Sequence, residues 1–174
     1  MRKILLVTVV IMMTFVGIQA FGVGIGVEGT GGVGGYGAYG YGGVMLTVKF
    51  DDAPYLAIGA DFWQWGGYVG MTADWWLINN KIAGPLYWYL GVGPYLGMRW
   101  YNTNYWGSMY GNPPSFGFNV GVRVPIGLHV FPEKWFECFL EFAPSAGVGF
   151  WAFDGTAVYP DWHLQGSLGV RFWF

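Results

Sequence analysis

The sequence has little charge, almost no cysteine and few long apolar runs. Only 10% of its 174 residues are Asp, Glu, Lys or Arg, whereas 54% are hydrophobic. So little charge cannot cover a water-facing surface, which argues against an ordinary soluble domain. A single cysteine, Cys138, excludes an internal disulfide framework. The sequence also has no basic run, so we expect no nucleic-acid partner.

A continuous apolar run occurs only at the start of the chain. After Arg2 and Lys3, uncharged residues extend from Ile4 to about Ile18 and are followed by Gln19-Ala20. A basic start, an apolar stretch and a small residue at the end are typical of a secretory signal peptide. We therefore predict a cleaved signal peptide at residues 1–20 and one domain at residues 21–174. The alternative is an uncleaved helical anchor, for which the run is short.

The rest of the chain alternates with a period of two, which indicates strands with different environments on their two faces. Between residues 44 and 51, for example, the even positions are Val, Leu, Val and Phe, and the odd positions are Met, Thr, Lys and Asp. The same split recurs after each turn. Together with an opening strand near residue 21, the pattern predicts eight strands, at about residues 21–29, 44–51, 56–63, 69–76, 87–99, 118–129, 136–145 and 162–174.

The charged residues of these segments share the less apolar face. That face carries Lys49, Asp61, Asp74, Arg99, Arg123, Glu137, Glu141 and Arg171. A soluble barrel or sandwich would turn this face to water and fill it with Lys, Glu and Thr, but here Gly, Tyr and Trp dominate it. Glycines and rings suit the narrow interior of an eight-stranded barrel. We therefore predict an all-β fold, an eight-stranded antiparallel up-and-down transmembrane β-barrel with its apolar face toward lipid.

An even number of strands places both ends of the barrel domain on the periplasmic side. The outward connections are then residues 29–43, 64–67, 102–115 and 152–160, and the periplasmic turns are residues 51–54, 78–85 and 131–135. Pro94 and Pro144 fall within strands, where proline removes a hydrogen-bond donor from the ladder. We expect β-bulges at both prolines.

The last residues, SLGVRFWF, alternate apolar side chains up to a terminal aromatic ring. Their apolar members resemble the C-terminal element by which the barrel assembly machinery recognises bacterial outer-membrane proteins; these are Leu168, Val170, Phe172 and Phe174. Over residues 21–174 the pattern resembles the small eight-stranded outer-membrane barrels, the class of the OmpA transmembrane domain. Two motifs, RVPIGLHVF at residues 123–131 and FLEFAP at residues 139–144, are similar to a family of small spirochaetal outer-membrane proteins. The resemblance implies a location in the bacterial outer membrane, with membrane lipid and the assembly machinery as partners.

The interior charges are the first candidate site. Counting back from the predicted hairpin places Glu141 opposite Arg171, with Arg123 one strand away. A charge in a narrow lumen is costly unless it is paired. We therefore expect an ion-pair cluster of Arg123, Glu141 and Arg171, with Asp61 and Asp74 on nearby walls. Such a cluster would plug the barrel, and a gated path for small solutes is the alternative.

Other candidate chemistry is weaker. Asp161 and His163, with Ser145 or Ser167, are the residue types of a hydrolytic Ser-His-acid site, but no nucleophile elbow accompanies them. With two His and one Cys that are not clustered, we expect no metal site and no cofactor.

The segments at residues 29–43 and 102–115 are rich in Gly, Tyr, Asn and Ser. This mixture suits adaptable binding loops and flexible connectors equally. The sequence therefore predicts a non-enzymatic outer-membrane barrel with a structural or surface-interaction role, in which an extracellular ligand would bind the loops. The alternatives are a narrow pore for small solutes and a lipid-acting outer-membrane enzyme.

Overall fold

The computed structural model describes residues 22–34, 39–51, 54–64, 66–101, 116–152 and 158–174. The predicted signal peptide and the segment at residues 102–115 lie outside these ranges, so both remain predictions. Within the described ranges, no helix is long and apolar enough to span a membrane.

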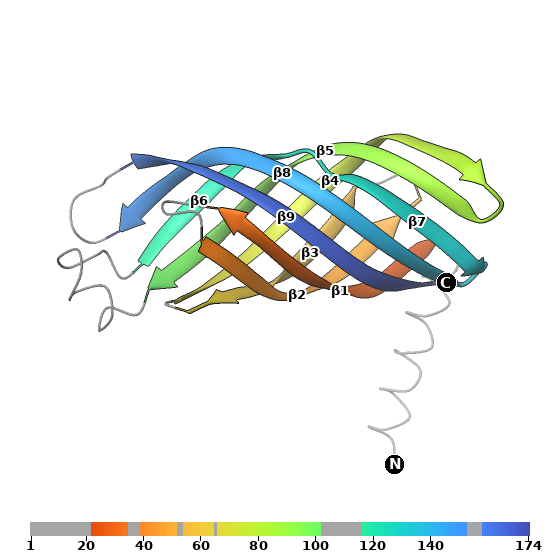
Figure 1. The fold of residues 1–174 in the computed structure, drawn as a ribbon, viewed down its shortest axis with the longest axis horizontal. Coiled ribbons are helices and arrows are strands. Elements are labelled where there is room, and N and C mark those ends of the chain that lie inside the picture. The colour runs from red at the N-terminus through yellow and green to blue at the C-terminus, as the bar shows by residue number, and fades with distance from the viewer. Residues whose placement is uncertain (1–21, 35–38, 52–53, 65, 102–115, 153–157) are drawn as a thin grey trace, which may run out of the picture.

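The described residues form an antiparallel sheet that closes into a ring (Figure 1). From β1 to β6 each strand pairs with the next, β8 pairs with β9, and β1 pairs with β9 to close the barrel. Closure matters because an open edge in lipid leaves backbone groups without partners. The strands are β1 (Val23–Gly34), β2 (Tyr39–Phe50), β3 (Tyr55–Trp63), β4 (Gly66–Ala83), β5 (Leu86–Tyr101), β6 (Phe116–Arg123), β7 (Ile126–Glu133), β8 (Phe136–Ala152) and β9 (Val158–Trp173).

β6 and β7 together form one wall of the barrel. Both pair with β5 on one side and with β8 on the other. The register against β5 is the same before and after the interruption: Gly93 pairs with Arg123 of β6, and Leu90 pairs with Ile126 of β7. The interruption falls at Val124 and Pro125, where proline has no N–H to donate. With β6 and β7 counted as one interrupted strand, the ring has eight strands, and the predicted eight-stranded up-and-down barrel is confirmed.

The predicted bulges at Pro94 and Pro144 are wrong. The pairing of Pro94 with Val122 and of Pro144 with Leu164 continues in register. The ladder tolerates Pro144 because its carbonyl still accepts the N–H of Val124, at 3.0 Å. Register shifts occur instead in the β4–β5 ladder, between Trp76 and Ile78 and again beside the turn, and in the β7–β8 ladder after Val130.

The barrel has a loop end and a turn end. The loop end is where β1 finishes at Gly34 and β3 at Trp63, and the turn end holds Val23 and Trp173. At the turn end, the N–H of Phe174 donates to the carbonyl of Val23, at 3.0 Å. The connection predicted at residues 29–43 is wrong in extent, because β1 continues to Gly34 and β2 starts at Tyr39. Ladder pairing in a closed ring outweighs the low strand propensity of these glycines.

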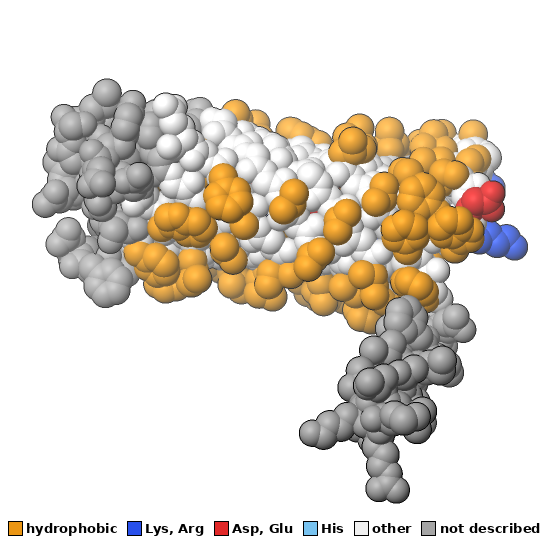
Figure 2. Space-filling view, turned by 90° about the horizontal axis from the view of Figure 1, so that it is seen from below, with side chains coloured by type: hydrophobic (Ala, Val, Ile, Leu, Met, Phe, Trp, Pro, Cys, Tyr) orange, Lys and Arg blue, Asp and Glu red, His pale blue; other side chains and the backbone are white. Residues whose placement is uncertain are grey.

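The apolar faces of the strands point outward. Leu46 is 63% exposed on the outer surface, whereas Arg123 is 1% and Arg171 is 0% exposed inside. Figure 2 shows hydrophobic side chains along the barrel wall, while the charged side chains visible on that face gather at one end. This arrangement is the reverse of a soluble barrel and agrees with the predicted orientation.

Inside, aromatic rings lie over glycines. The ring of Tyr68 occupies the space where Gly70 and Gly97 would carry a side chain, and Tyr89 does the same at Gly127. The interior of an eight-stranded barrel is just wide enough to be filled in this way. A second set of glycines is different: Gly42, Gly31 and Gly166 adjoin one another across β2, β1 and β9, and each has room for a Cβ.

Candidate functional site

The middle of the lumen is occupied by a network around Arg123 of β6. Its guanidinium forms an ion pair with Glu141 of β8 and donates to Oε1 of Gln165 on β9, at 3.0 Å. Its Nε lies 3.4 Å from Oδ2 of Asp74 on β4. All four side chains are buried. Because they come from separate walls, the contacts cross the lumen.

One tyrosine extends this network directly, and a second tyrosine binds a carboxylate that interacts with it electrostatically. Tyr89 of β5 donates its hydroxyl to Oε2 of Glu141, at 2.7 Å. Tyr55 of β3 donates to Oε2 of Glu28 on β1, at 2.9 Å. Buried carboxylates need such donors, because an ionised group without partners is costly in a low-dielectric interior. We call the following seven residues the central network: Glu28, Tyr55, Asp74, Tyr89, Arg123, Glu141 and Gln165.

A second network lies nearer the turn end and is organised by Glu137 of β8. Arg171 of β9 donates to its Oε2 at 2.7 Å, and Nε1 of Trp173 donates to the same oxygen at 2.6 Å. The other oxygen lies 2.9 Å from Nδ1 of His129, whose Nε2 lies 2.9 Å from Oδ1 of Asn79. The turn-end network therefore joins β4, β7, β8 and β9.

Aromatic rings surround the guanidinium of Arg171. Its Cζ lies 4.6 Å from the ring centre of Phe139 and 4.9 Å from that of Tyr55. A guanidinium held over ring faces gains cation–π stabilisation in addition to its ion pair. Arg171 is therefore fixed by packing as well as by charge.

The predicted pairing of Glu141 with Arg171 is wrong. In the β8–β9 ladder, Arg171 faces Glu137, and Glu141 faces Ser167. The connection was expected at residues 152–160, but the pair next to it in the structure is Phe150 with Val158. Because the connection lies earlier in the sequence than expected, every residue of β8 faces a different residue of β9. Arg123 and Glu141 do meet, with Asp74 beside them, but Arg171 belongs to the turn-end network.

A third group of polar residues lies toward the loop end. Asp161 of β9 accepts hydrogen bonds from Tyr95 and Asn119, both at 2.9 Å, and forms an ion pair with Arg99 at 3.0 Å. Asp61 of β3 accepts a hydrogen bond from the hydroxyl of Thr30. Among the described side chains no ion pair joins Asp61 to the central network, with which it was expected to pair.

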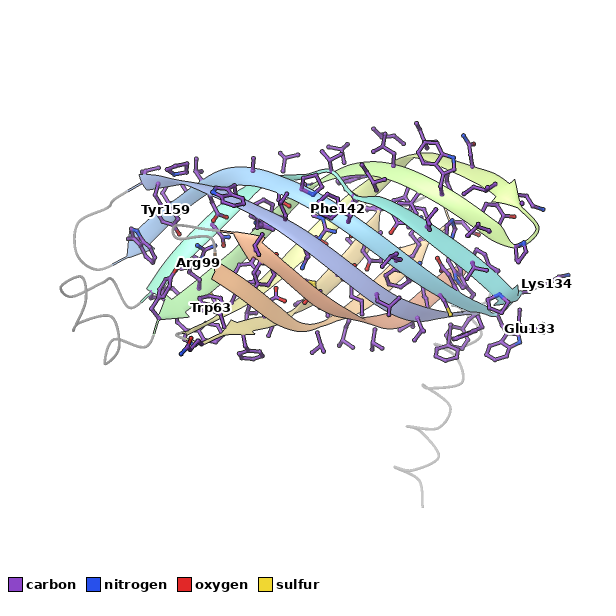
Figure 3. The ribbon with its side chains drawn as sticks, viewed as in Figure 1. Trp63, Arg99, Glu133, Lys134, Phe142 and Tyr159 are labelled. Carbon is purple, nitrogen blue, oxygen red and sulfur yellow. The ribbon has the colours of Figure 1, made fainter. Side chains whose placement is uncertain are left out.

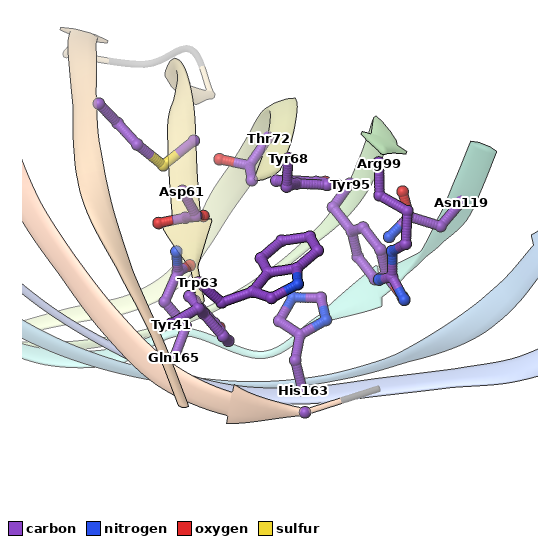
Figure 4. A pocket seen from close by; sticks show the side chains of 12 residues that line it. Tyr41, Asp61, Trp63, Tyr68, Thr72, Tyr95, Arg99, Asn119, His163 and Gln165 are labelled. Atoms are coloured by element: carbon purple, nitrogen blue, oxygen red, sulfur yellow. The ribbon is translucent and has the colours of Figure 1, made fainter. Parts of the chain in front are cut away.

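This group borders a small cavity, the loop-end cavity, shown in Figure 4. The volume open to water-sized molecules is about 50 Å³. Polar side chains and aromatic rings share its wall, among them Asp61, Thr72 and Asn119 with Tyr41, Trp63 and Tyr68. Figure 3 places Trp63, Arg99 and Tyr159 toward this end of the barrel and Glu133 and Lys134 at the opposite end.

The residues considered for hydrolysis have other contacts. Ser145 faces His163 across the β8–β9 ladder, but its hydroxyl donates to the carbonyl of Ala143, at 3.3 Å. The ring of His163 meets that of Tyr95 edge-on, with 4.7 Å between centres. Asp161 is already bonded to three donors. Among the described residues, no three His, Cys, Asp or Glu side chains come together as a metal site would require.

Sequence reasoning missed three participants. Glu28 and Asp161 were not assigned to the interior charges, and Glu137 was placed on the inner face without a partner. Glu28 has the same parity as the inner-face glycines of its strand, and Asp161 has the same parity as Gln165. The period of two therefore already indicated that both side chains point inward. The four residues of the predicted C-terminal assembly element lie along β9 and just after it. Their recognition by the assembly machinery stays a prediction.

Comparison with solved structures identifies the fold. Neisserial surface protein A aligns with a TM-score of 0.53 and 13% identity over 87% of this chain and 97% of that chain. The N-terminal β-barrel domain of Pseudomonas aeruginosa OprF aligns with a TM-score of 0.50 and 14% identity over 87% and 97%. Ail, the attachment invasion locus protein of Yersinia pestis, aligns with a TM-score of 0.48 and 13% identity over 88% and 99%.

At these identities the similarity shows the fold alone, which is that of the small eight-stranded outer-membrane barrels. No family model matches the sequence, and no curated protein matches it at a significant level. The narrower resemblance to small spirochaetal outer-membrane proteins therefore stays a prediction.

Proposed function

We propose that this chain is an integral, non-enzymatic protein of the bacterial outer membrane, with a closed interior and a structural or surface-interaction role at its loop end. The observation that carries the proposal is the inverted barrel: apolar side chains such as Leu46 lie outside, and buried, paired charges such as Arg123 and Glu141 lie inside. This distribution is energetically favourable only when hydrocarbon surrounds the barrel. The fold shared with Neisserial surface protein A, which is named as a surface protein, supports the same placement.

Membrane fractionation tests the placement. We expect the protein in the outer-membrane fraction, with an electrophoretic mobility that changes on heating because the closed barrel resists unfolding by detergent. External protease should cut the predicted loop at residues 102–115 in intact cells and leave the barrel whole. Recovery in a soluble fraction, or in the inner membrane, would contradict the proposal.

The central network supports a closed interior, because its contacts cross the lumen between walls. The loop-end cavity favours a second candidate function, a narrow pore, because it opens space within the lumen as far as Gln165, the residue to which Arg123 donates. The variant Glu141→Gln separates the two, with Glu133→Gln at the exposed turn as control. If the network is a structural plug, Glu141→Gln should lower the melting temperature, and any change in bilayer conductance should come with that loss of stability. Altered conductance with unchanged melting would favour the pore.

The non-enzymatic part of the proposal has its own test. The purified protein in mixed micelles with outer-membrane lipid should leave that lipid intact over long incubation. Lipid turnover that disappears in His163→Gln would establish the lipid-acting alternative and contradict our proposal.

A further inference from the structure

The loop-end cavity contains a buried carboxylate without a cationic partner. Asp61 is 4% exposed, and the ion pairs among the described side chains do not include it. One oxygen accepts a hydrogen bond from Thr30, and Arg123 acts on the carboxylate only from beyond ion-pair distance. A buried charge of this kind is costly unless an opposite charge reaches it.

The remaining charges around the cavity compensate each other. Arg99 and Asp161 form their own ion pair at 3.0 Å, and His163 is the other titratable side chain besides tyrosines on the cavity wall. With His163 neutral and the charge of Arg99 balanced by Asp161 behind the wall, a net charge of about −1 remains at the cavity, and it comes from Asp61. The field in the cavity therefore favours cations over anions.

Aromatic rings face the same space. Tyr41, Trp63 and Tyr68 come from β2, β3 and β4, and Figure 4 shows the indole of Trp63 across the cavity, with Asp61 on one side and His163 on the other. The faces of such rings attract organic cations, and methylated ammonium groups are the cations that aromatic cages bind best. Rings and a carboxylate together suit an ammonium group better than a metal ion.

Two buried polar atoms on the wall lack partners. Thr72 is 7% and Asn119 is 3% exposed, and neither Oγ1 of Thr72 nor Oδ1 of Asn119 has a hydrogen-bond partner within the described structure. Buried polar atoms of native proteins are nearly always bonded to protein, water or ligand. The amide oxygen can only accept, so the N–H of a partly methylated ammonium ion, or water beside a fully methylated one, would satisfy it.

The size of the cavity restricts the ligand. A volume of about 50 Å³ for water-sized occupants corresponds to roughly three to five water molecules. A methylated ammonium ion displaces a similar amount of water, whereas a disaccharide does not fit. From charge, rings, acceptors and volume, we infer that the loop-end cavity binds a small organic cation of the methylated ammonium class, with Asp61 as its counter-ion. The inference rests on the proposed function in one respect only: the outer-membrane placement determines from which side of the membrane the ligand enters the cavity.

Titration of the purified protein in detergent micelles tests the inference independently of membrane location. Tetramethylammonium chloride is the probe, and sodium chloride at equal ionic strength and glucose are the comparisons. We expect saturable binding by calorimetry for tetramethylammonium and none for glucose. Asp61→Asn keeps the shape and the Thr30 contact, and should weaken binding by at least about tenfold. Glu133→Gln removes one negative charge from the opposite end and should leave binding unchanged.

The wild-type protein gives a second measurement if Asp61→Asn does not fold. The indole N–H resonance of Trp63, assigned with Trp63→Phe, should shift on titration, and that of Trp173 at the turn end should not. Absence of saturable binding, equal losses in Asp61→Asn and Glu133→Gln, or equal shifts of both indoles would overturn the inference. Glucose binding that depends on Asp61 would overturn the cation class and assign the cavity to neutral polyols. Recovery of a tetramethylammonium-binding protein from a soluble fraction would refute the proposed function but not the site.

Discussion

Arg123 and Glu141 form an ion pair in the centre of the barrel, and Asp74 approaches the same guanidinium from another wall. The three charges come from β6, β8 and β4. One cation thus holds two carboxylates in an interior that excludes most water. The barrel depends on this arginine more than on either acid, because its loss leaves two buried carboxylates without their cation.

Removal of the arginine should therefore be strongly destabilising. We expect Arg123→Gln to cost about 3–5 kcal/mol of unfolding free energy, the usual cost of breaking a buried pair from one side. Urea unfolding in detergent micelles, followed by tryptophan fluorescence, measures it. Lys134→Gln changes the same charge at an exposed turn and should have no measurable effect. Equal stability of the two variants would show that the central network does not hold the barrel together.

The two faces of each strand could be predicted from the sequence because a closed barrel gives each face a single environment. Leu46 and Lys49 differ in parity, and the structure places the first outside and the second inside. The period of two survives small errors in strand boundaries. This explains why the fold was predictable although no family model matches.

The partners of the interior charges could not be predicted in the same way. The pairing of Arg171 depends on where the β8–β9 connection ends, and the predicted connection assigned it to Glu141 instead of Glu137. Contacts such as Tyr55 with Glu28 join walls that are not adjacent. Such contacts depend on the stagger and tilt of the strands, which no local pattern encodes.

The interior glycines should not tolerate a side chain. A Cβ at Gly97 would meet the ring of Tyr68, so Gly97→Ala should cost about 1–3 kcal/mol through overpacking. Gly42→Ala is the matched control on the outer face, where the nearest atom to a Cβ is the Thr30 carbonyl at 3.5 Å. We expect the control to be neutral or to stabilise by about 0.5–1 kcal/mol. Urea unfolding of both variants tests this, and equal effects would contradict the packed interior.

A charge on the outer face should be costly in lipid. Leu46 is exposed on β2 in the middle part of the ladder with β3, so Leu46→Arg should destabilise the barrel by about 2–4 kcal/mol in phospholipid bilayers. Leu46→Ala separates the charge from the lost side chain and should cost less. Reversible unfolding from bilayers gives both values. If Leu46→Arg is no worse than Leu46→Ala, the outer face of the barrel does not meet hydrocarbon.

Arg171 should not be replaceable by lysine, because its guanidinium serves two kinds of contact at once. It donates to Glu137 at 2.7 Å while its plane lies near the rings of Phe139 and Tyr55. A lysine ammonium can keep the ion pair but is a compact, strongly hydrated charge that does not stack. We expect Arg171→Lys to cost about 1–2 kcal/mol, and a double-mutant cycle with Phe139→Leu to show a coupling of about 0.5–2 kcal/mol. Urea unfolding of the four proteins gives the coupling, and a value of zero would mean that the ion pair alone holds Arg171 and that the rings only fill space.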